Sequence, residues 1–287
     1  MKAEEIRTFG VVGAGQMGSG IAQVAALAGL DVWMEDVAQA FLDRGVRSIE
    51  KSLQKAIDKR KLDEQAAKAT RARVRTTTSL EDLKGCDFVV EAVTEDAGLK
   101  REAFAALDGL LAPPAILASN TSSISITELA ASTKRADRFI GMHFFNPVPT
   151  MTLVEVVRGH ETSEATFELT RDLALRLGKD PCVAKDFPGF VSNRVLMPMI
   201  NEAIFALHEG VADAESIDKV MKRGLNHPMG PLELADFIGL DTCLSIMLVL
   251  QEGFGDSKYR PCPLLRKMVR AGHLGRKSGR GFYNYLD

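Results

Sequence analysis

The 287-residue sequence has few cysteines, no metal-binding motif and no long apolar run. Its four cysteines stand far apart, without the Cys-x-x-Cys or Cys/His spacing of a redox or zinc site. We therefore expect reduced thiols and no bound metal. The longest apolar stretches, such as Cys243 to Leu250, are far shorter than the roughly 20 residues that cross a bilayer. The first residues include two acids and lead into glycines, unlike a secretory signal. We expect a soluble, cytoplasmic protein without a membrane partner.

An excess of charge of one sign is also missing. The 36 Lys and Arg residues nearly balance the 38 Asp and Glu residues, and the formal net charge is -2. Such a chain has no broad positive field to attract nucleic acid, although a local basic cluster can still bind a phosphate group. Nucleic acid is therefore not an expected partner.

The first two thirds of the chain alternate short β-branched runs with helical patterns. This alternation predicts an α/β fold with a doubly wound, Rossmann-type parallel sheet. The expected strands are Thr8 to Val12, Asp31 to Met34, Arg73 to Arg75, Phe88 to Glu91, Ile116 to Ala118, Arg138 to Met142, Leu153 to Val157 and Cys182 to Ala184.

A long helical segment, at residues 38–72, interrupts this pattern. Apolar residues recur there at the spacing of one helical face, at Val46, Ile49, Leu53 and Ile57. Because an ordinary crossover helix has about 11 or 12 residues, we expect an arm that leaves the sheet and turns back near Asp58 to Asp63. Such an arm can cover a ligand.

The chain after Pro188 and Gly189 has helical patterns only. The expected helices are Phe190 to His208, Asp213 to Lys222, Leu232 to Glu252 and Leu264 to Ala271. We therefore expect a sheet domain at residues 1–186 and an all-helical domain at residues 187–287. The helical domain is rich in Met, Leu and Ile, which favours a homodimer formed through it. The alternative is a monomer whose methionines fill core gaps.

A glycine motif directly follows the first strand and opens an apolar helix. It reads Gly13-Ala14-Gly15-Gln16-Met17-Gly18, the GxGxxG that binds the pyrophosphate of a dinucleotide at a helix N-terminus. The second strand ends near Asp36, which can accept hydrogen bonds from an adenosine ribose. Its charge would repel a 2′-phosphate, so we expect NAD rather than NADP.

Candidate catalytic residues follow later strands. Ser122 lies in the turn Ser119-Asn120-Thr121-Ser122-Ser123, where a simple helix-capping role is the alternative. His143 ends one strand, and Glu155 is the only charge in the next, Leu153 to Val157. A buried carboxylate needs a partner, and a His held by one can take a proton from a hydroxyl while hydride leaves the same carbon. Asn193, near the start of the helical domain, can donate to a substrate oxygen or simply belong to a first helical turn.

Several ordered motifs together resemble the 3-hydroxyacyl-CoA dehydrogenase family. They are GxGxMG at 13–18, SNTSS at 119–123, HFFNPVP at 143–149, LVEVV at 153–157, GFVSNR at 189–194, NHPMGPLELADFIGLD at 226–241 and KSGRGFY at 277–283. The similarity covers nearly the whole chain, and the compact length resembles the family's bacterial 3-hydroxybutyryl-CoA dehydrogenases.

The resemblance implies residue roles. It places the catalytic pair on His143 and Glu155 and the substrate-oxygen contacts on Ser122 and Asn193. The cofactor contacts that it implies are the glycine loop, Asp36, Glu95, Lys100, Ser122, Asn146 and Lys277. It also places coenzyme A contacts on Ser52 and Lys59, where neighbouring Lys and Arg residues suit phosphates or a solvated helix face.

The implied reaction is the reversible NAD-dependent oxidation of a short (S)-3-hydroxyacyl-CoA, such as 3-hydroxybutyryl-CoA, to the 3-ketoacyl-CoA, such as acetoacetyl-CoA. One alternative is a related dehydrogenase of a free hydroxy acid such as L-gulonate. Another is a crystallin-like relative that keeps the fold without turnover. The basic arm argues against the first, and the intact set of four catalytic residues against the second.

Overall fold

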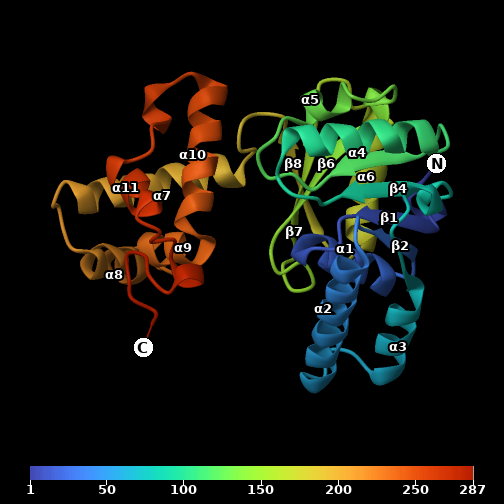
Figure 1. Cartoon of the computed structure of the whole chain (residues 1–287), viewed down its shortest axis with the longest axis horizontal. Coiled ribbons are helices and arrows are strands. Elements are labelled where there is room, and N and C mark those ends of the chain that lie inside the picture. The colour runs from blue at the N-terminus through green and yellow to red at the C-terminus, as the bar shows by residue number, and fades with distance from the viewer. Residues whose placement is uncertain (287) are drawn as a thin grey trace. The chain divides into compact units, whose positions relative to one another are not determined.

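In a computed structural model, which describes residues 1–286, the chain divides into two compact units, Met1–Phe187 and a second that begins at Pro188. The first unit contains an eight-stranded, mostly parallel sheet with helices on both faces, and the second is helical (Figure 1). The fold class expected from the sequence is therefore confirmed.

The strands of the sheet are β1 (Thr8–Val12), β2 (Asp31–Glu35), β3 (Val74–Thr77), β4 (Phe88–Glu91), β5 (Ile116–Ser119), β6 (Phe139–Phe144), β7 (Leu153–Arg158) and β8 (Asp180–Lys185). They lie in the order β3-β2-β1-β4-β5-β6-β7-β8. Strands β1 to β6 are parallel, whereas β7 is antiparallel to β6 and parallel to β8. The last two strands depart from the expected parallel arrangement because only a loop, without a crossover helix, connects β6 to β7.

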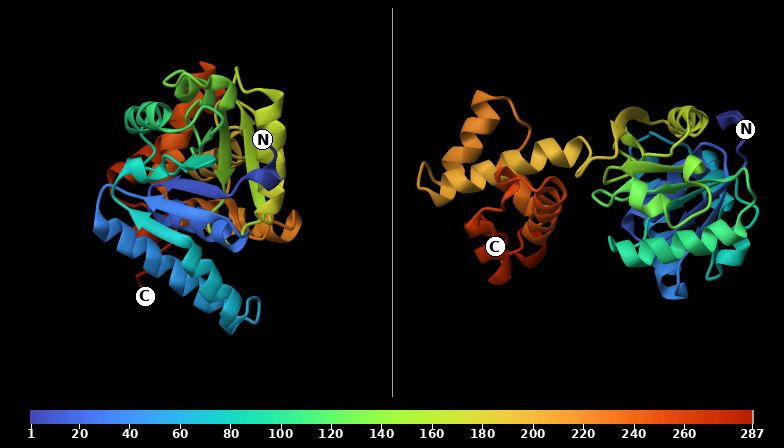
Figure 2. Two further views of the ribbon diagram at one scale, coloured as in Figure 1. Left: turned by 90° about the vertical axis from the view of Figure 1, so that its right-hand side faces the viewer. Right: turned by 90° about the horizontal axis from the view of Figure 1, so that it is seen from above.

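The helices of the first unit are α1 (Gln16–Leu27), α2 (Gln39–Asp58), α3 (Glu64–Arg73), α4 (Ala97–Leu110), α5 (Ile126–Ala130) and α6 (Glu164–Arg176). Apolar side chains of α1, α2 and α6 share one core with the sheet. Helix α4 lies on the other side of the sheet from α6 (Figure 2), and its Phe104 packs edge-to-face on Phe139 of β6, with ring centroids 4.6 Å apart. Burial on both faces explains why the central strands are continuous apolar runs.

The inserted arm consists of α2 and α3, which lie side by side and extend away from the sheet (Figures 1 and 2). Leu42, Ile49 and Leu53 are buried along one face of α2. The chain turns at Arg60, which has φ 55°. Asp63 then begins α3 by accepting the N–H of Ala66 at 2.7 Å. The arm is thus a helical hairpin with Lys59, Arg60 and Lys61 at its tip.

The second unit consists of α7 (Ser192–His208), α8 (Ala214–Gly224), α9 (Pro231–Ile238), α10 (Leu240–Phe254) and α11 (Pro263–Arg270). The single helix expected at Leu232 to Glu252 is wrong. Gly239, with φ 103°, breaks it into α9 and α10, since this backbone conformation cannot continue a right-handed helix.

Two buried acids organise the second unit. Asp218 accepts the N–H groups of Leu232 and Glu233, both at 2.9 Å, in the first turn of α9. Asp236 accepts the N–H groups of Phe282 and Tyr283, both at 3.0 Å, and so holds the C-terminal segment. Burial raises the pKa of Asp236, although these hydrogen bonds oppose the shift. The motifs at 226–241 and 277–283 therefore support the structure of this unit.

Candidate functional site

The glycine loop connects β1 to α1. Gly13 has φ 101°, a conformation that residues with a Cβ rarely adopt. At Gly18 a Cβ would lie 1.8 Å from the carbonyl oxygen of Gly13, so the turn closes only with glycine there. At Gly15, the N-cap of α1, a Cβ would meet nothing within 4 Å. The open space above Gly15 and the N-terminal amides of α1 fit the pyrophosphate of a dinucleotide.

Asp36 follows β2 and lies against the glycine loop. Its Oδ2 accepts the main-chain N–H of Ala14 at 2.7 Å. The preceding acid, Glu35, is buried instead, and burial, with a smaller effect of the Asp36 charge, raises its pKa to about 7. Of the two acids, Asp36 is therefore the one placed to meet an adenosine ribose.

His143 and Glu155 are directly opposed on the antiparallel strands β6 and β7. Nδ1 of His143 lies 2.7 Å from Oε2 of Glu155. His143 is 9% exposed and Glu155 is 1% exposed. Because a carboxylate only accepts hydrogen bonds, Nδ1 donates, and Nε2 is the basic nitrogen of the neutral ring. The structure brings together the two residues that the sequence analysis paired.

The loop after β5 surrounds the carboxylate of Glu95. Oε1 of Glu95 accepts the hydroxyl of Thr121 at 2.6 Å. The same oxygen accepts the main-chain N–H groups of Ser122 at 2.9 Å and Ser123 at 3.1 Å. Burial alone would raise the pKa of Glu95, but the charge of Lys100 and these hydrogen bonds outweigh burial and lower it. An ionised Glu95 thus fixes the loop that carries Ser122.

Lys100 lies behind Glu95 in the core of the unit and is 1% exposed. Its Nζ lies 2.6 Å from Oε1 of Glu91 and 3.3 Å from Oε2 of Glu95. Glu91 also accepts the hydroxyl of Ser119 at 2.7 Å. Glu91 and Ser119 are site residues that the sequence motifs do not predict. The available signal was the acid that ends the apolar strand β4, since a buried carboxylate needs partners.

Asn146 lies in the loop from β6 to β7, and its Oδ1 accepts a hydrogen bond from Nε2 of Gln16 at 3.0 Å. The loop therefore touches the start of α1. Strands β1, β2, β5 and β6 all present candidate residues at or just beyond their carboxyl ends. This is the edge at which doubly wound sheets bind ligands.

The remaining candidate residues lie elsewhere. Ser52 is half-buried on α2, and Lys59 is exposed at the end of that helix. A hollow of about 420 Å³ lies at the tip of the arm, lined by Ile57, Arg60, Lys61, Leu62 and Asp63. In the second unit, Asn193 lies in the first turn of α7 and is 8% exposed. Lys277 donates to Oδ2 of Asp241 at 2.6 Å.

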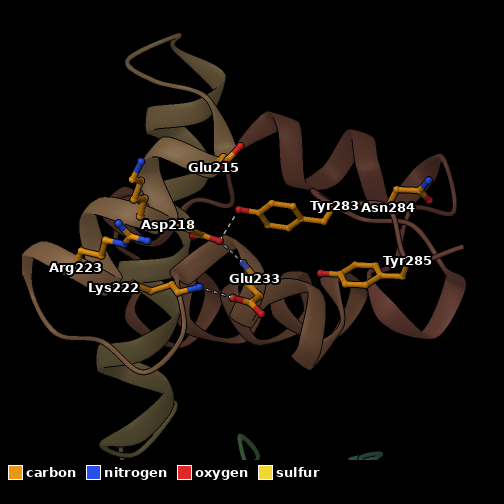
Figure 3. A pocket seen from close by; sticks show the side chains of 9 residues that line it. Glu215, Asp218, Lys222, Arg223, Glu233, Tyr283, Asn284 and Tyr285 are labelled. Carbon is orange, nitrogen blue, oxygen red and sulfur yellow. Dashed lines mark hydrogen bonds and ion pairs between the residues drawn. The ribbon is translucent and has the colours of Figure 1, made fainter. Parts of the chain in front are cut away.

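The second unit also has a pocket of about 490 Å³ (Figure 3). It is lined by Glu215, Asp218, Lys219, Lys222, Arg223, Glu233, Tyr283, Asn284 and Tyr285. The hydroxyl of Tyr283 donates to Asp218 at 2.8 Å, and Lys222 pairs with Glu233 at 3.5 Å. These polar side chains are engaged with one another, which indicates a structural role.

Residues 1–286 contain no group of three or more His, Cys, Asp or Glu side chains that could hold a metal ion. None of their helices has both the length and the apolar character needed to cross a membrane.

Comparison with known proteins identifies the family. Residues 8–187 match the description "3-hydroxyacyl-CoA dehydrogenase, NAD binding domain", and residues 189–285 match the C-terminal domain of the same family. A probable 3-hydroxybutyryl-CoA dehydrogenase of Deinococcus radiodurans is 60% identical over 277 residues, which cover 96% of this chain and 99% of that protein. The 3-hydroxybutyryl-CoA dehydrogenase of Bradyrhizobium diazoefficiens is 56% identical, over 99% of this chain and 97% of that protein.

A solved structure agrees along the same length. The crystal structure of an (S)-3-hydroxybutyryl-CoA dehydrogenase from Ralstonia eutropha superposes with a TM-score of 0.97 and 54% identity, covering 99% of this chain and 100% of that one. The family resemblance and the NAD cofactor expected from the sequence are confirmed. The chain belongs to the 3-hydroxyacyl-CoA dehydrogenase family and is an NAD-dependent oxidoreductase.

Proposed function

We propose that the enzyme catalyses the reversible oxidation of (S)-3-hydroxybutyryl-CoA, or a similarly short 3-hydroxyacyl-CoA, to the 3-ketoacyl-CoA. The observation that carries this proposal is the buried contact of His143 with Glu155 at 2.7 Å. The names and high identities of the relatives support the choice of substrate. Acetoacetyl-CoA is the product in the oxidative direction and the substrate in the reductive one.

In this reaction Nε2 of His143 takes the proton of the 3-hydroxyl group. Glu155 stabilises the imidazolium through Nδ1, and it holds the ring in the tautomer that leaves Nε2 basic. NAD, when bound, would supply the acceptor for the hydride that leaves C3 of the substrate. Ser122 and Asn193 donate hydrogen bonds that orient the reacting oxygen. In the reductive direction His143 returns the proton to the same oxygen.

We propose that the cofactor is held by the glycine loop, Asp36, Glu95, Ser122, Asn146 and Lys277. We propose a different role for Lys100. Because its side chain is 1% exposed and lies within 3.3 Å of Glu95, it acts by holding Glu95. The strong negative partners of Lys100 favour this indirect role over a direct cofactor contact.

The arm provides the coenzyme A contacts in this proposal. Lys59, about two turns after Ser52 at the end of the same helix, offers a positive charge to the phosphate groups of coenzyme A. We expect Lys59→Ala to raise KM for acetoacetyl-CoA several-fold at low ionic strength and to leave KM for NADH unchanged. Added salt weakens this effect, because exposed charges are screened. An unchanged KM for the thioester would remove Lys59 from the substrate site.

The substrate class is tested by NADH absorbance. The native enzyme is assayed with acetoacetyl-CoA and with free acetoacetate, each with NADH and with NADPH. We expect rapid loss of NADH with the thioester only, and slower turnover with NADPH. Turnover of the free acid at a similar rate would support the hydroxy-acid alternative, such as an L-gulonate dehydrogenase. NADH binding without any turnover would support the crystallin-like alternative.

We also propose a homodimer formed through the second unit. Its exposed apolar side chains support this proposal and include Val195, Val211, Val220, Leu225 and Phe237. The methionines argue less for it than expected, because Met197 and Met247 are 1% exposed within the core of the unit. Light scattering of the native protein tests the dimer, and a monomeric mass at assay concentration would contradict it.

A further inference from the structure

A lysine outside the candidate site is buried beneath the loop that joins β6 to β7. Lys179, just before β8, is 7% exposed. Its Nζ donates to the carbonyl oxygens of Val148 at 2.5 Å and Met151 at 2.8 Å. Burial lowers the pKa of Lys179, which reflects the cost of placing a charge there. Lysine is rarely buried unless it is paired, so this position needs an explanation.

The loop held by Lys179 connects the strand of His143 to the strand of Glu155. It is also held from the side of the glycine loop, where Gln16 donates to Asn146 at 3.0 Å. Val148 is 2% exposed and packs on α1 so closely that a Cβ at Gly20 would lie 2.8 Å from its own Cβ. The loop from β6 to β7 is thus held on one side by α1, which begins at the glycine loop, and on the other side by Lys179.

An apolar side chain could fill the same space without the cost of a buried charge. A charged donor adds directional hydrogen bonds, which fix the loop's main chain in place. We propose that Lys179 is a positioning residue for NAD: it holds the carbonyls of Val148 and Met151 so that Asn146 stays against the glycine loop. This inference rests on the proposed contact of Asn146 with the cofactor, and it does not depend on the acyl substrate.

The test is the dissociation constant for NADH, measured by fluorescence titration without any thioester. We expect Lys179→Met to raise it about tenfold, since small misplacements of positioning groups have large effects. KM for acetoacetyl-CoA at saturating NADH should change less than about twofold. Lys185→Met, at the exposed end of β8, is the matched control and should bind NADH as the native enzyme does.

A second variant perturbs the same loop from the side of α1, where a Cβ at Gly20 would lie 2.8 Å from the Cβ of Val148. Gly20→Ala should displace Val148 and raise the NADH dissociation constant in the same selective way, so it carries the test if Lys179→Met does not fold. A folded Lys179→Met with a lower Tm but native NADH affinity would show a purely structural role and overturn the inference. A native NADH dissociation constant in folded Gly20→Ala would overturn it as well. Failure of the thioester assay would instead count against the proposed function, because NADH titration involves no substrate.

Discussion

His143 and Glu155 face each other across β6 and β7, with 2.7 Å between Nδ1 and Oε2. Directly opposed residues of antiparallel strands point to the same face of a sheet, so the strand register itself creates this contact. The pair is held by main-chain pairing on both sides and is nearly excluded from water. The pairing of the strands and the burial of the two side chains both favour a histidine that stays in one orientation and one tautomer.

Glu155→Gln tests the charge of this pair while preserving its shape. The amide oxygen can still accept from Nδ1 of His143, but the imidazolium loses its negative partner. We expect kcat with acetoacetyl-CoA to fall by about 100-fold or more. The dissociation constant for NADH should not change. A kcat within twofold of the native value, in a folded variant, would argue against a role for the carboxylate.

Gly15→Ala and Gly18→Ala separate cofactor binding from folding. A Cβ at Gly15 meets no protein atom within 4 Å, so we expect native Tm but much weaker NADH binding. A Cβ at Gly18 would lie 1.8 Å from a carbonyl oxygen, so we expect a loss of about 1–3 kcal/mol in unfolding free energy as well. Calorimetry and NADH titration measure the two effects. Equal NADH affinity in Gly15→Ala and the native protein would contradict pyrophosphate binding here.

Glu95 predicts a dependence of stability on pH. Its pKa is lower in the folded protein than its ordinary value of 4.5, so the ionised form stabilises the fold. This stabilisation is fully present above the ordinary pKa and is lost as pH falls through the folded one. Glu95→Gln should therefore be less stable than the native enzyme at pH 7, and the difference should shrink below pH 4.5. The measurement is the Tm of both proteins across this pH range. A Tm difference that does not change with pH would contradict the prediction.

Asp36 predicts the choice of cofactor. Its carboxylate lies at the glycine loop, where it would repel the 2′-phosphate of NADPH. Asp36→Asn keeps an oxygen for the N–H of Ala14 but removes the charge. We expect the ratio of kcat/KM for NADPH over NADH to rise about tenfold, which corresponds to about 1.4 kcal/mol of removed repulsion. An unchanged ratio would mean that another group sets the preference.

Much of the first unit was predictable from local pattern. The glycine turn and the apolar strands are short-range features, and the expected bounds of β1 and β4 agree with the structure. Glu155 is recognisable as the only charge in the apolar run Leu153 to Val157. The break between α9 and α10 at Gly239 is not predicted, because the apolar helical period continues on both sides of it. Only the backbone conformation of Gly239 shows that the helix ends there.

The contacts of the buried lysines Lys179 and Lys100 are less predictable from the sequence. The acceptors of Lys179 are main-chain carbonyls about thirty residues earlier, and no pattern of residue types specifies such a pairing. The partners of Lys100 come from β4 and the loop after it, so its burial depends on how α4 packs. Tertiary contacts of this kind give a residue its role without leaving a motif.

In the proposed mechanism, His143 transfers the proton when NADH reduces the thioester. The most direct test of this role is the kcat of a folded His143→Gln variant with acetoacetyl-CoA, together with its NADH dissociation constant. We predict a kcat lower by about 10²–10⁴-fold, with nearly native NADH binding. A kcat close to that of the native enzyme would contradict the claim and move the search for the base to another residue.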